Sequence, residues 1–183
     1  MHGSQQHFHY PPGEVVTANP GFSVILNATL NGIRIGSFTS ENQFAAVTQD
    51  HAEDQLIDEL TAAIEWARMG HPQMAVQGAG AQVIPALEAG IHQGRTVHSL
   101  QIDLSASPCS TAFGTSTKIN GAGCAERLVE LTQLRFGNED QYGLAINVRA
   151  HHLYQPRHIQ DPAQVSTQVN QWMASRGVPV QIG

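Results

Sequence analysis

The chain has 183 residues, of which 41% are hydrophobic and 13% are charged. This length and composition give room for one domain with an ordinary core, and they exclude a disordered segment or a coiled coil. No apolar stretch is long enough to span a bilayer, so we expect no membrane partner. The chain has 9 Lys and Arg against 15 Asp and Glu, which gives a formal net charge of −6. This balance counts against tight, sequence-independent binding to duplex nucleic acid.

The two cysteines are too few to staple a domain of this size. A single disulfide would be unusual here, so we expect buried thiols or metal ligands in a reducing compartment such as the cytoplasm.

The N-terminal part of the chain divides near residue 20. Residues 1–20 are rich in His and Pro with little apolar periodicity, and we interpret them as a flexible tail before one domain at 21–183. Two β-rich runs then flank Asn31-Gly32, a dipeptide typical of a tight hairpin. This pattern predicts strands over 22–30 and 33–39.

The later elements follow from apolar spacing and from Gly and Pro positions. The predicted helices are 51–69, 81–92 (with Pro85 inside it), 124–136 and 162–176, and the predicted strands are 97–104, 142–148 and 178–182. We take Asp161 as the N-cap of the last helix, followed by Pro162 at its first turn. A helix between the last two strands permits a right-handed crossover between parallel neighbours. The order predicts a three-layer α-β-α domain, in the α/β class, with a five-stranded mixed sheet.

Four residues in this framework have the chemistry of a hydrolytic zinc site. Such a site needs three protein ligands and an open position for water, and His51, Cys109 and Cys124 offer three ligands. Glu53 offers a carboxylate that can move protons without binding the metal. Positions two apart on a helix point in nearly opposite directions, so His51 and Glu53 can share a pocket only across the helix N-terminus. Cys124 also opens a helix, where the dipole favours a thiolate.

Each of these residues also has a structural interpretation. His51 could cap a helix, Glu53 could be a first-turn acid, and the two cysteines could be buried hydrophobic groups. For any one residue this is the commoner case. The combination favours zinc, because Pro108 directly precedes the first cysteine and each motif lies at a strand–helix junction.

His51-Ala52-Glu53, with Pro108-Cys109 and Cys124, resembles the signature of the cytidine deaminase-like superfamily, H-x-E followed by P-C-x-x-C. The resemblance covers about 22–183. It implies that the histidine and the two cysteines bind Zn²⁺ and that the glutamate is the proton shuttle.

The same resemblance implies substrate contacts. The backbone around Ala52 and Ser107 would contact the base, and Asn42 stands where an Asn often touches the sugar. A helix between the last two strands is similar to the branch that holds the tRNA adenosine deaminases, the AID/APOBEC enzymes and several bacterial toxin deaminases.

The chain departs from the family pattern between its cysteines. The usual two residues are here fourteen, Ser110 to Gly123. The enlarged loop, with Phe113, Thr115, Thr117 and Lys118, either borders the pocket or is an ordinary solvent loop. Cys124-Ala-Glu-Arg also resembles the first motif of free cytidine deaminases. No cysteine follows it to complete a second site, so we interpret Glu126 as a first-turn acid.

A basic and aromatic cluster follows the strand predicted at 142–148. Its members are Arg149, His151, His152, Tyr154 and Arg157. The cluster could line a nucleic-acid groove by stacking and phosphate contact, or it could be a solvated connection.

Three functional hypotheses result. The first is a zinc-dependent hydrolytic deaminase that converts cytosine to uracil in nucleic acid, with single-stranded DNA favoured, as a bacterial toxin or effector-type domain. Such a domain would be delivered to a cytoplasmic site of action and would have a cognate immunity protein as a partner. The second is a metabolic deaminase of a free base, nucleoside or nucleotide, or an adenine or RNA deaminase; the acidic charge suits a small substrate. The third is a non-catalytic zinc-stabilised module in which Glu53 is incidental.

Overall fold

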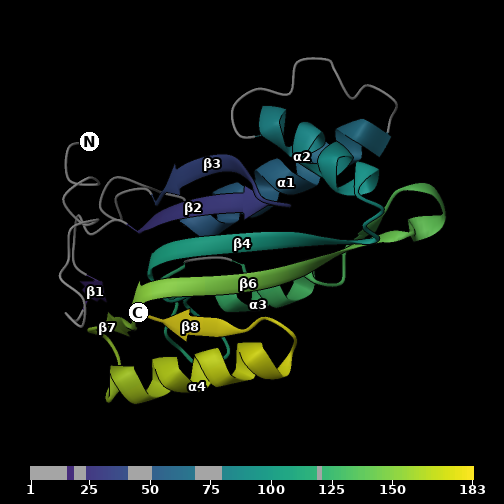
Figure 1. Ribbon diagram of the computed structural model, residues 1–183. Helices are drawn as coiled ribbons and strands as arrows, with labels where there is room; N and C mark the ends of the chain where they lie inside the picture. Colours follow the sequence, from purple (N-terminus) through teal and green to yellow (C-terminus); the bar gives the residue numbers. More distant parts are fainter. Residues whose placement is uncertain (1–15, 19–23, 41–50, 69–79, 119–120) are drawn as a thin grey trace.

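The computed structural model describes residues 16–18, 24–40, 51–68, 80–118 and 121–183. Within these residues the chain forms an α/β domain with a mixed sheet, which is the predicted class. Figure 1 shows the long central strands crossing the molecule, with the helices packed along them. None of the helices described is both long and apolar enough to cross a membrane.

The hairpin around Asn31-Gly32 forms as predicted. Its strands are β2 (Ile25–Leu30) and β3 (Ile33–Thr39), which pair antiparallel. Asn31 and Gly32 have φ values of 51° and 82°. Positive φ at both central residues gives the turn twist that matches two right-twisted strands, which explains the choice of Asn and Gly.

The remaining elements follow along the chain, and the sequence predicted most of them. The helices are α1 (Ala52–Arg68), α2 (Gly80–His92), α3 (Cys124–Leu131) and α4 (Pro162–Ser175), with a short 3-10 turn η2 (Asn138–Asp140). The strands are β1 (Val16–Ala18), β4 (Val97–Ala106), β5 (Arg135–Phe136), β6 (Tyr142–His152), β7 (Tyr154–Pro156) and β8 (Val180–Ile182).

The main sheet has six strands, where the sequence predicted five. Its order is β3-β2-β4-β6-β5, and β8 also pairs with β6. β2 runs antiparallel to β3 and β4, whereas β4, β6 and β8 run parallel to one another. The predicted crossover through the last helix therefore joins parallel neighbours.

The strand β4 shows how the sheet positions the core. Leu100, Ile102 and Leu104 are buried with at most 1% of their surface exposed. The residues between them, such as Gln101 and Asp103, are partly exposed on the opposite face. This period of two is that of a strand with one face in the core.

Two predictions about helix ends are wrong in part. The helix predicted at 124–136 ends at Leu131, because the following N–H groups bond to carbonyls only three residues back and the chain then enters β5. The Thr132 hydroxyl also bonds the Val129 carbonyl, which competes with continued helix. Asp161 is at the N-cap position and Pro162 in the first turn, as predicted, but Asp161 has φ 51° and its side chain makes no bond to the helix N-terminus.

The strands β1 and β7 were not predicted. They pair parallel as a small separate sheet, with Val16 opposite Tyr154. β1 lies within the stretch interpreted as a tail, and the domain boundary near residue 20 stays a prediction.

Candidate metal centre

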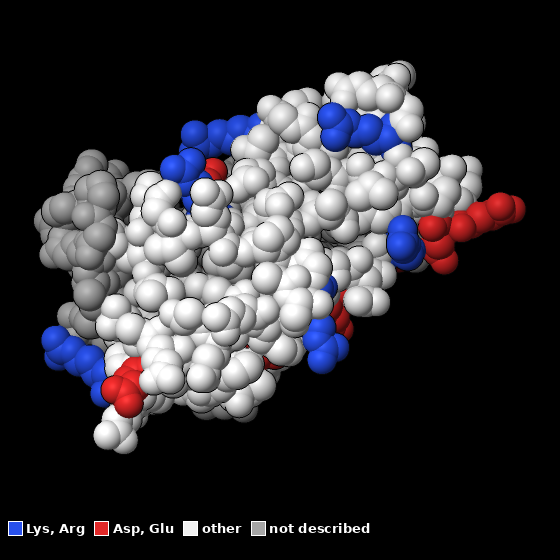
Figure 2. Space-filling view, turned by 60° about the horizontal axis from the view of Figure 1, so that its bottom comes forward, with Lys and Arg blue, Asp and Glu red and all other residues white. Residues whose placement is uncertain are grey.

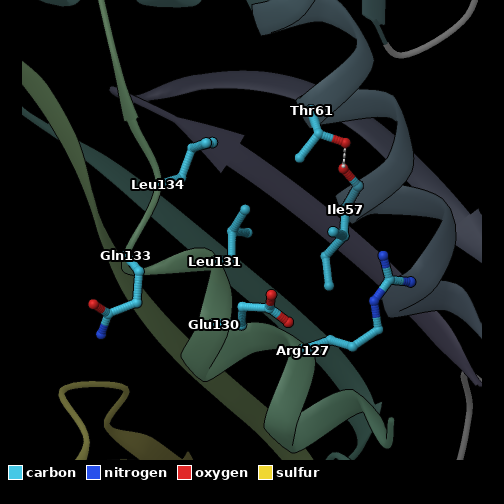
Figure 3. A pocket seen from close by; sticks show the side chains of 7 residues that line it. All are labelled: Ile57, Thr61, Arg127, Glu130, Leu131, Gln133 and Leu134. Atoms are coloured by element: carbon cyan, nitrogen blue, oxygen red, sulfur yellow. Dashed lines mark hydrogen bonds between the residues drawn. The ribbon is translucent and has the colours of Figure 1, made fainter. Parts of the chain in front are cut away.

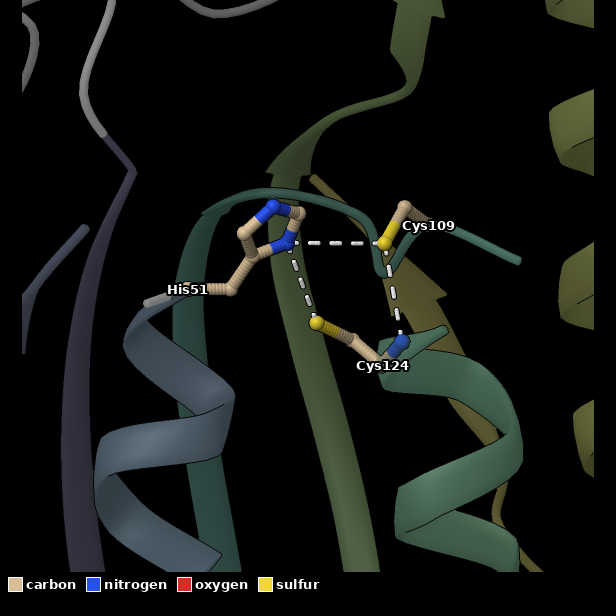
Figure 4. Close-up of side chains that lie close together, drawn as sticks. All are labelled: His51, Cys109 and Cys124. Atoms are coloured by element: carbon tan, nitrogen blue, oxygen red, sulfur yellow. Dashed lines mark hydrogen bonds between the residues drawn. The ribbon is translucent and has the colours of Figure 1, made fainter. Parts of the chain in front are cut away.

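Three elements bring the predicted ligands to one end of the sheet. His51 directly precedes α1, Cys109 follows the end of β4 by three residues, and Cys124 is the first residue of α3. Figure 4 shows the imidazole and the two sulfur atoms pointing toward one another from these elements. Both cysteines are buried and free.

The distances fit a zinc ion. The Nδ1 atom of His51 lies 3.5 Å from Sγ of Cys109 and 3.3 Å from Sγ of Cys124. The three ligand atoms all lie within 4.8 Å of one another. A tetrahedral ion with zinc–nitrogen and zinc–sulfur bonds of about 2.1 and 2.3 Å holds such atoms about 3.6–3.8 Å apart. One imidazole and two thiols are also a donor set that zinc prefers.

The first turn of α3 helps to fix the two cysteines. The Ala125 N–H donates to the Cys109 carbonyl at 2.8 Å, and the Cys124 N–H points at the Cys109 sulfur at 3.5 Å. These N–H groups have no partner inside the helix, and they lie at its positive end. The helix start therefore satisfies its own backbone and stabilises negative charge on sulfur.

The ligand side chains influence one another's protonation. The pKa of Cys109 is held well below its ordinary value by hydrogen bonds to its sulfur. The bond from the Cys124 thiol has the larger effect and the bond from the His51 imidazole the smaller one. Burial by itself would lower the pKa of His51, but the hydrogen bond and negative charge of Cys109 raise it overall. The site thus makes the thiolate form of Cys109 more favourable than it is in an ordinary cysteine.

Glu53 lies beside this cluster in the first turn of α1, and only 3% of its surface is exposed. Burial is the main reason that its pKa is raised to about 7, against a smaller opposing effect of His51. A carboxyl group with this pKa can both accept and release a proton near neutral pH.

The predicted substrate contacts have different positions. Ala52 is fully buried at the start of α1. Ser107 is buried where β4 ends; its N–H donates to the His152 carbonyl and its hydroxyl accepts from the Tyr154 N–H. Asn42 lies outside the described residues. A role of any of these in substrate binding stays a prediction.

The enlarged loop between the cysteines is built into the fold rather than free in solvent. Thr115 is fully buried and accepts a bond from the Ser110 N–H, while the Phe113 ring packs near the Trp172 ring of α4 at 6.4 Å between centroids. Ser116 lies beside the site, with its hydroxyl 3.5 Å from the Cys109 sulfur. The interpretation as an ordinary solvent loop is therefore wrong for these residues.

Glu126 is a first-turn acid of α3, as interpreted from the sequence. Its carboxylate accepts from the Thr111 N–H at 2.9 Å and from the Ser110 hydroxyl. It thereby ties the loop after Cys109 to α3.

Sequence reasoning missed Asp54 and the two cations that meet it. The Asp54 carboxylate accepts from Lys118 at 2.8 Å and from Arg127 at 2.6 Å, and its second oxygen lies 3.3 Å from the His51 N–H. An acid three residues into a helix is a known capping signal, and only that part could have been anticipated.

The basic and aromatic cluster does not form a stacking surface. His152 and Tyr154 are 4% and 5% exposed, and Tyr154 packs against Ala106 and the two cysteines. Arg149 donates from Nε to the Gly183 carbonyl. The proposed groove for bases is therefore wrong for these aromatic side chains.

Two solved structures show a distant likeness to this chain. No protein-family model and no curated protein matches the sequence. Among solved structures, the Rib2 deaminase of Aspergillus oryzae, in complex with DARIPP, is similar with 12% identity and a TM-score of 0.44, over 98% of this chain and 78% of that one. RibD of Acinetobacter baumannii is similar with 16% identity and a TM-score of 0.36, over 90% of this chain and 29% of that one. Neither likeness is close enough to assign an activity to this chain.

Proposed function

We propose that this protein is a zinc-dependent hydrolytic deaminase that acts on the exocyclic amine of a nucleobase. The observation that carries the proposal is the convergence of His51, Cys109 and Cys124 at zinc-ligand distances, with the Glu53 carboxyl buried beside them.

The residues have separate tasks in this reaction. A zinc ion held by His51, Cys109 and Cys124 would supply a Lewis acid that lowers the pKa of water toward neutrality. Glu53 would take the proton of the attacking water and deliver it to the leaving amine. The base thereby gains a carbonyl oxygen from water and releases ammonia.

A small substrate, a free base, nucleoside or nucleotide, is the first candidate. The net charge of −6 disfavours a long phosphate footprint, and the side chains of His152 and Tyr154 are buried rather than available for stacking. Figure 2 shows one face of the molecule, on which charged side chains of both signs are scattered without a basic patch.

Cytosine in single-stranded DNA, within a toxin or effector-type domain opposed by an immunity protein, is the second candidate. The enlarged loop favours it, because Ser116 places that loop beside Cys109 where flanking nucleotides could be contacted. An adenine or RNA substrate would use the same chemistry.

The test measures ammonia release from pyrimidine and purine bases, nucleosides and nucleotides, and sequence changes in single-stranded DNA and RNA oligonucleotides. The matched variants are Glu53→Gln, in the site, and Glu130→Gln, exposed on α3. We expect Glu53→Gln to lose about 10²- to 10⁴-fold in kcat, as for removal of a general acid–base group, with zinc content unchanged. Glu130→Gln should keep wild-type activity.

The outcomes separate the candidates. Deamination of monomeric substrates alone identifies a metabolic enzyme, and deamination of oligonucleotides alone identifies a nucleic-acid enzyme. A zinc-loaded protein without activity on any of them would favour a zinc-stabilised binding module instead. Loss of zinc in Glu53→Gln would contradict the role given to Glu53.

A further inference from the structure

The long spacing between the cysteines raises the question of what holds α3 in place against α1. A two-residue link would tether Cys124 directly to Cys109, but fourteen residues, Ser110 to Gly123, stand between them. The loop is held to α3 by the bond from the Ala125 N–H to the Cys109 carbonyl and by the bonds of Glu126, but none of these contacts reaches α1. The zinc ligands must nevertheless meet within a few tenths of an ångström.

Apolar packing does not fix the two helices along their whole length. A cavity of about 360 Å³ lies between them, lined by Ile57 and Thr61 of α1 and by residues of α3 and the turn after it. Figure 3 shows side chains of the two helices facing one another across the cavity, with the Arg127 side chain extending toward α1. The separation of the helix starts therefore depends on contacts outside the cavity.

Asp54 supplies such contacts from the first turn of α1. Its Oδ1 atom accepts from Nζ of Lys118 at 2.8 Å and from a guanidinium nitrogen of Arg127 at 2.6 Å. Lys118 belongs to the enlarged loop and also donates to the Ala122 carbonyl at 2.7 Å, two residues before Cys124. One carboxylate thus joins the helix that follows His51, the loop, and the helix that begins at Cys124.

The bond between Asp54 and Lys118 is shielded from water, whereas the Arg127 side chain is 29% exposed. The side chains of Asp54 and Lys118 are 8% and 5% exposed. Arg127 also pairs with Asp58 at 3.0 Å, but the Asp58 side chain is 66% exposed, and pairs of that kind contribute little. Breaking a buried pair is costly because it leaves an uncompensated charge.

We propose that Asp54 is a positioning residue for the metal centre: through Lys118 and Arg127 it sets the spacing of α1 and α3, and with it the position of His51 relative to the two cysteines. This inference rests on the proposed zinc site. It predicts that Asp54 governs the affinity for zinc while touching neither the ion nor the substrate.

The experiment measures zinc affinity by competition with a chromophoric chelator, for the full chain and for three variants. Asp54→Asn removes the shared acceptor, Lys118→Met removes one donor, and Asp58→Asn removes only the exposed partner of the same arginine. Outer-shell partners of metal ligands typically change affinity 10- to 100-fold, and we expect a loss of about that size for Asp54→Asn and Lys118→Met. Asp58→Asn should stay within about twofold of wild type.

A second measurement separates positioning from general stability. The thermal unfolding of each metal-free variant is compared with that of Val169→Ala, a core change on α4 outside both ligand-bearing helices. Val169→Ala should lower the melting temperature by a similar amount but keep its zinc affinity. If Asp54→Asn loses zinc affinity where Val169→Ala does not, the positioning role is supported. If Asp54→Asn does not fold, Lys118→Met decides by the same criterion.

Wild-type zinc affinity in folded Asp54→Asn or Lys118→Met would overturn the inference and leave the proposed function standing. A wild-type protein that binds zinc without deaminase activity would overturn the proposed function alone, because the affinity comparison is still made. A wild-type protein that binds no zinc would overturn both.

Discussion

Asn31, at the turn between β2 and β3, is both a turn residue and a buried polar anchor. Its Nδ2 donates to the Ala86 carbonyl at 3.0 Å and to Nδ1 of His98 at 2.7 Å, and its Oδ1 accepts from the Ser99 N–H at 3.0 Å. The opposite amide orientation would set its oxygen against the Ala86 carbonyl, so these contacts fix the orientation. It follows that His98 accepts at Nδ1 and carries its proton on Nε2.

Gly90 lies in α2 where that anchor approaches most closely. A Cβ atom at this position would lie 2.3 Å from Nδ2 of Asn31 and 2.6 Å from Nδ1 of His98. In an open helix Gly→Ala stabilises by about 1 kcal/mol. Here the clash with two buried, hydrogen-bonded side chains should outweigh that gain, since overpacking costs about 1–3 kcal/mol.

We therefore expect Gly90→Ala to lower the free energy of unfolding measured by urea denaturation. Glu88→Ala, exposed on the same helix, is the control and should change it by less than about 0.5 kcal/mol. A stabilised Gly90→Ala protein would show that the anchor can move aside.

Among the elements, the start of α3 is packed directly onto the loop that carries Cys109. A Cβ atom at Gly123 would lie 2.6 Å from the Thr111 nitrogen and 2.8 Å from the Ser110 Cα, both of which are backbone atoms. Backbone cannot swing away as a side-chain end can, so Gly123→Ala must push α3 away from the loop. We expect a loss of stability of about 1–3 kcal/mol together with weaker zinc binding, measured by urea denaturation and by chelator competition.

The control for this prediction is Glu130→Ala, which lies exposed on the same helix. It should leave both quantities unchanged. Loss of stability in Gly123→Ala with zinc affinity intact would mean that the ligand spacing does not depend on this contact.

The helices and strands also show which elements can be predicted from sequence patterns alone. The helix at 52–68 was predicted because a long stripe such as Leu56, Leu60 and Ile64 is buried at helical spacing. The sequence did not predict the end of α3, because that end depends on the pairing of Phe136 with Tyr142 in another strand. The two strands β1 and β7 have three residues each, too few to carry a period.

At the scale of the whole molecule, the three metal ligands were predictable from the sequence. The charged contacts that hold the ligand-bearing helices together were not. His51, Cys109 and Cys124 are recognisable because zinc chemistry restricts the residue types at strand and helix junctions. The pairing of Asp54 with Lys118 spans 64 residues and joins two common charged residue types. No local pattern identifies such a pair, since only the assembled fold brings the two groups together and excludes water.

The fold as a whole should become less stable in mild acid because it encloses His98. That side chain is fully buried, and its Nε2 has no hydrogen-bond partner among the described residues. The pKa of His98 is lowered from its ordinary value of 6.5, mainly by burial and to a smaller extent by the positive charge of Arg95. Protonation at Nδ1 would also set a donor against the Asn31 amide. The unfolded chain therefore binds this proton more readily than the folded one, and stability rises with pH in this range.

The contribution of His98 is complete above pH 6.5 and is lost as the pH falls from there through the lower folded-state pKa. Urea denaturation from about pH 7.5 to about pH 5.5 should show a larger loss of unfolding free energy for the wild type than for His98→Gln, because glutamine does not titrate. Above that range His98 is neutral in both states, so the difference between the two proteins should be constant there. Parallel curves over the whole range would mean that another group carries the acid sensitivity of the fold.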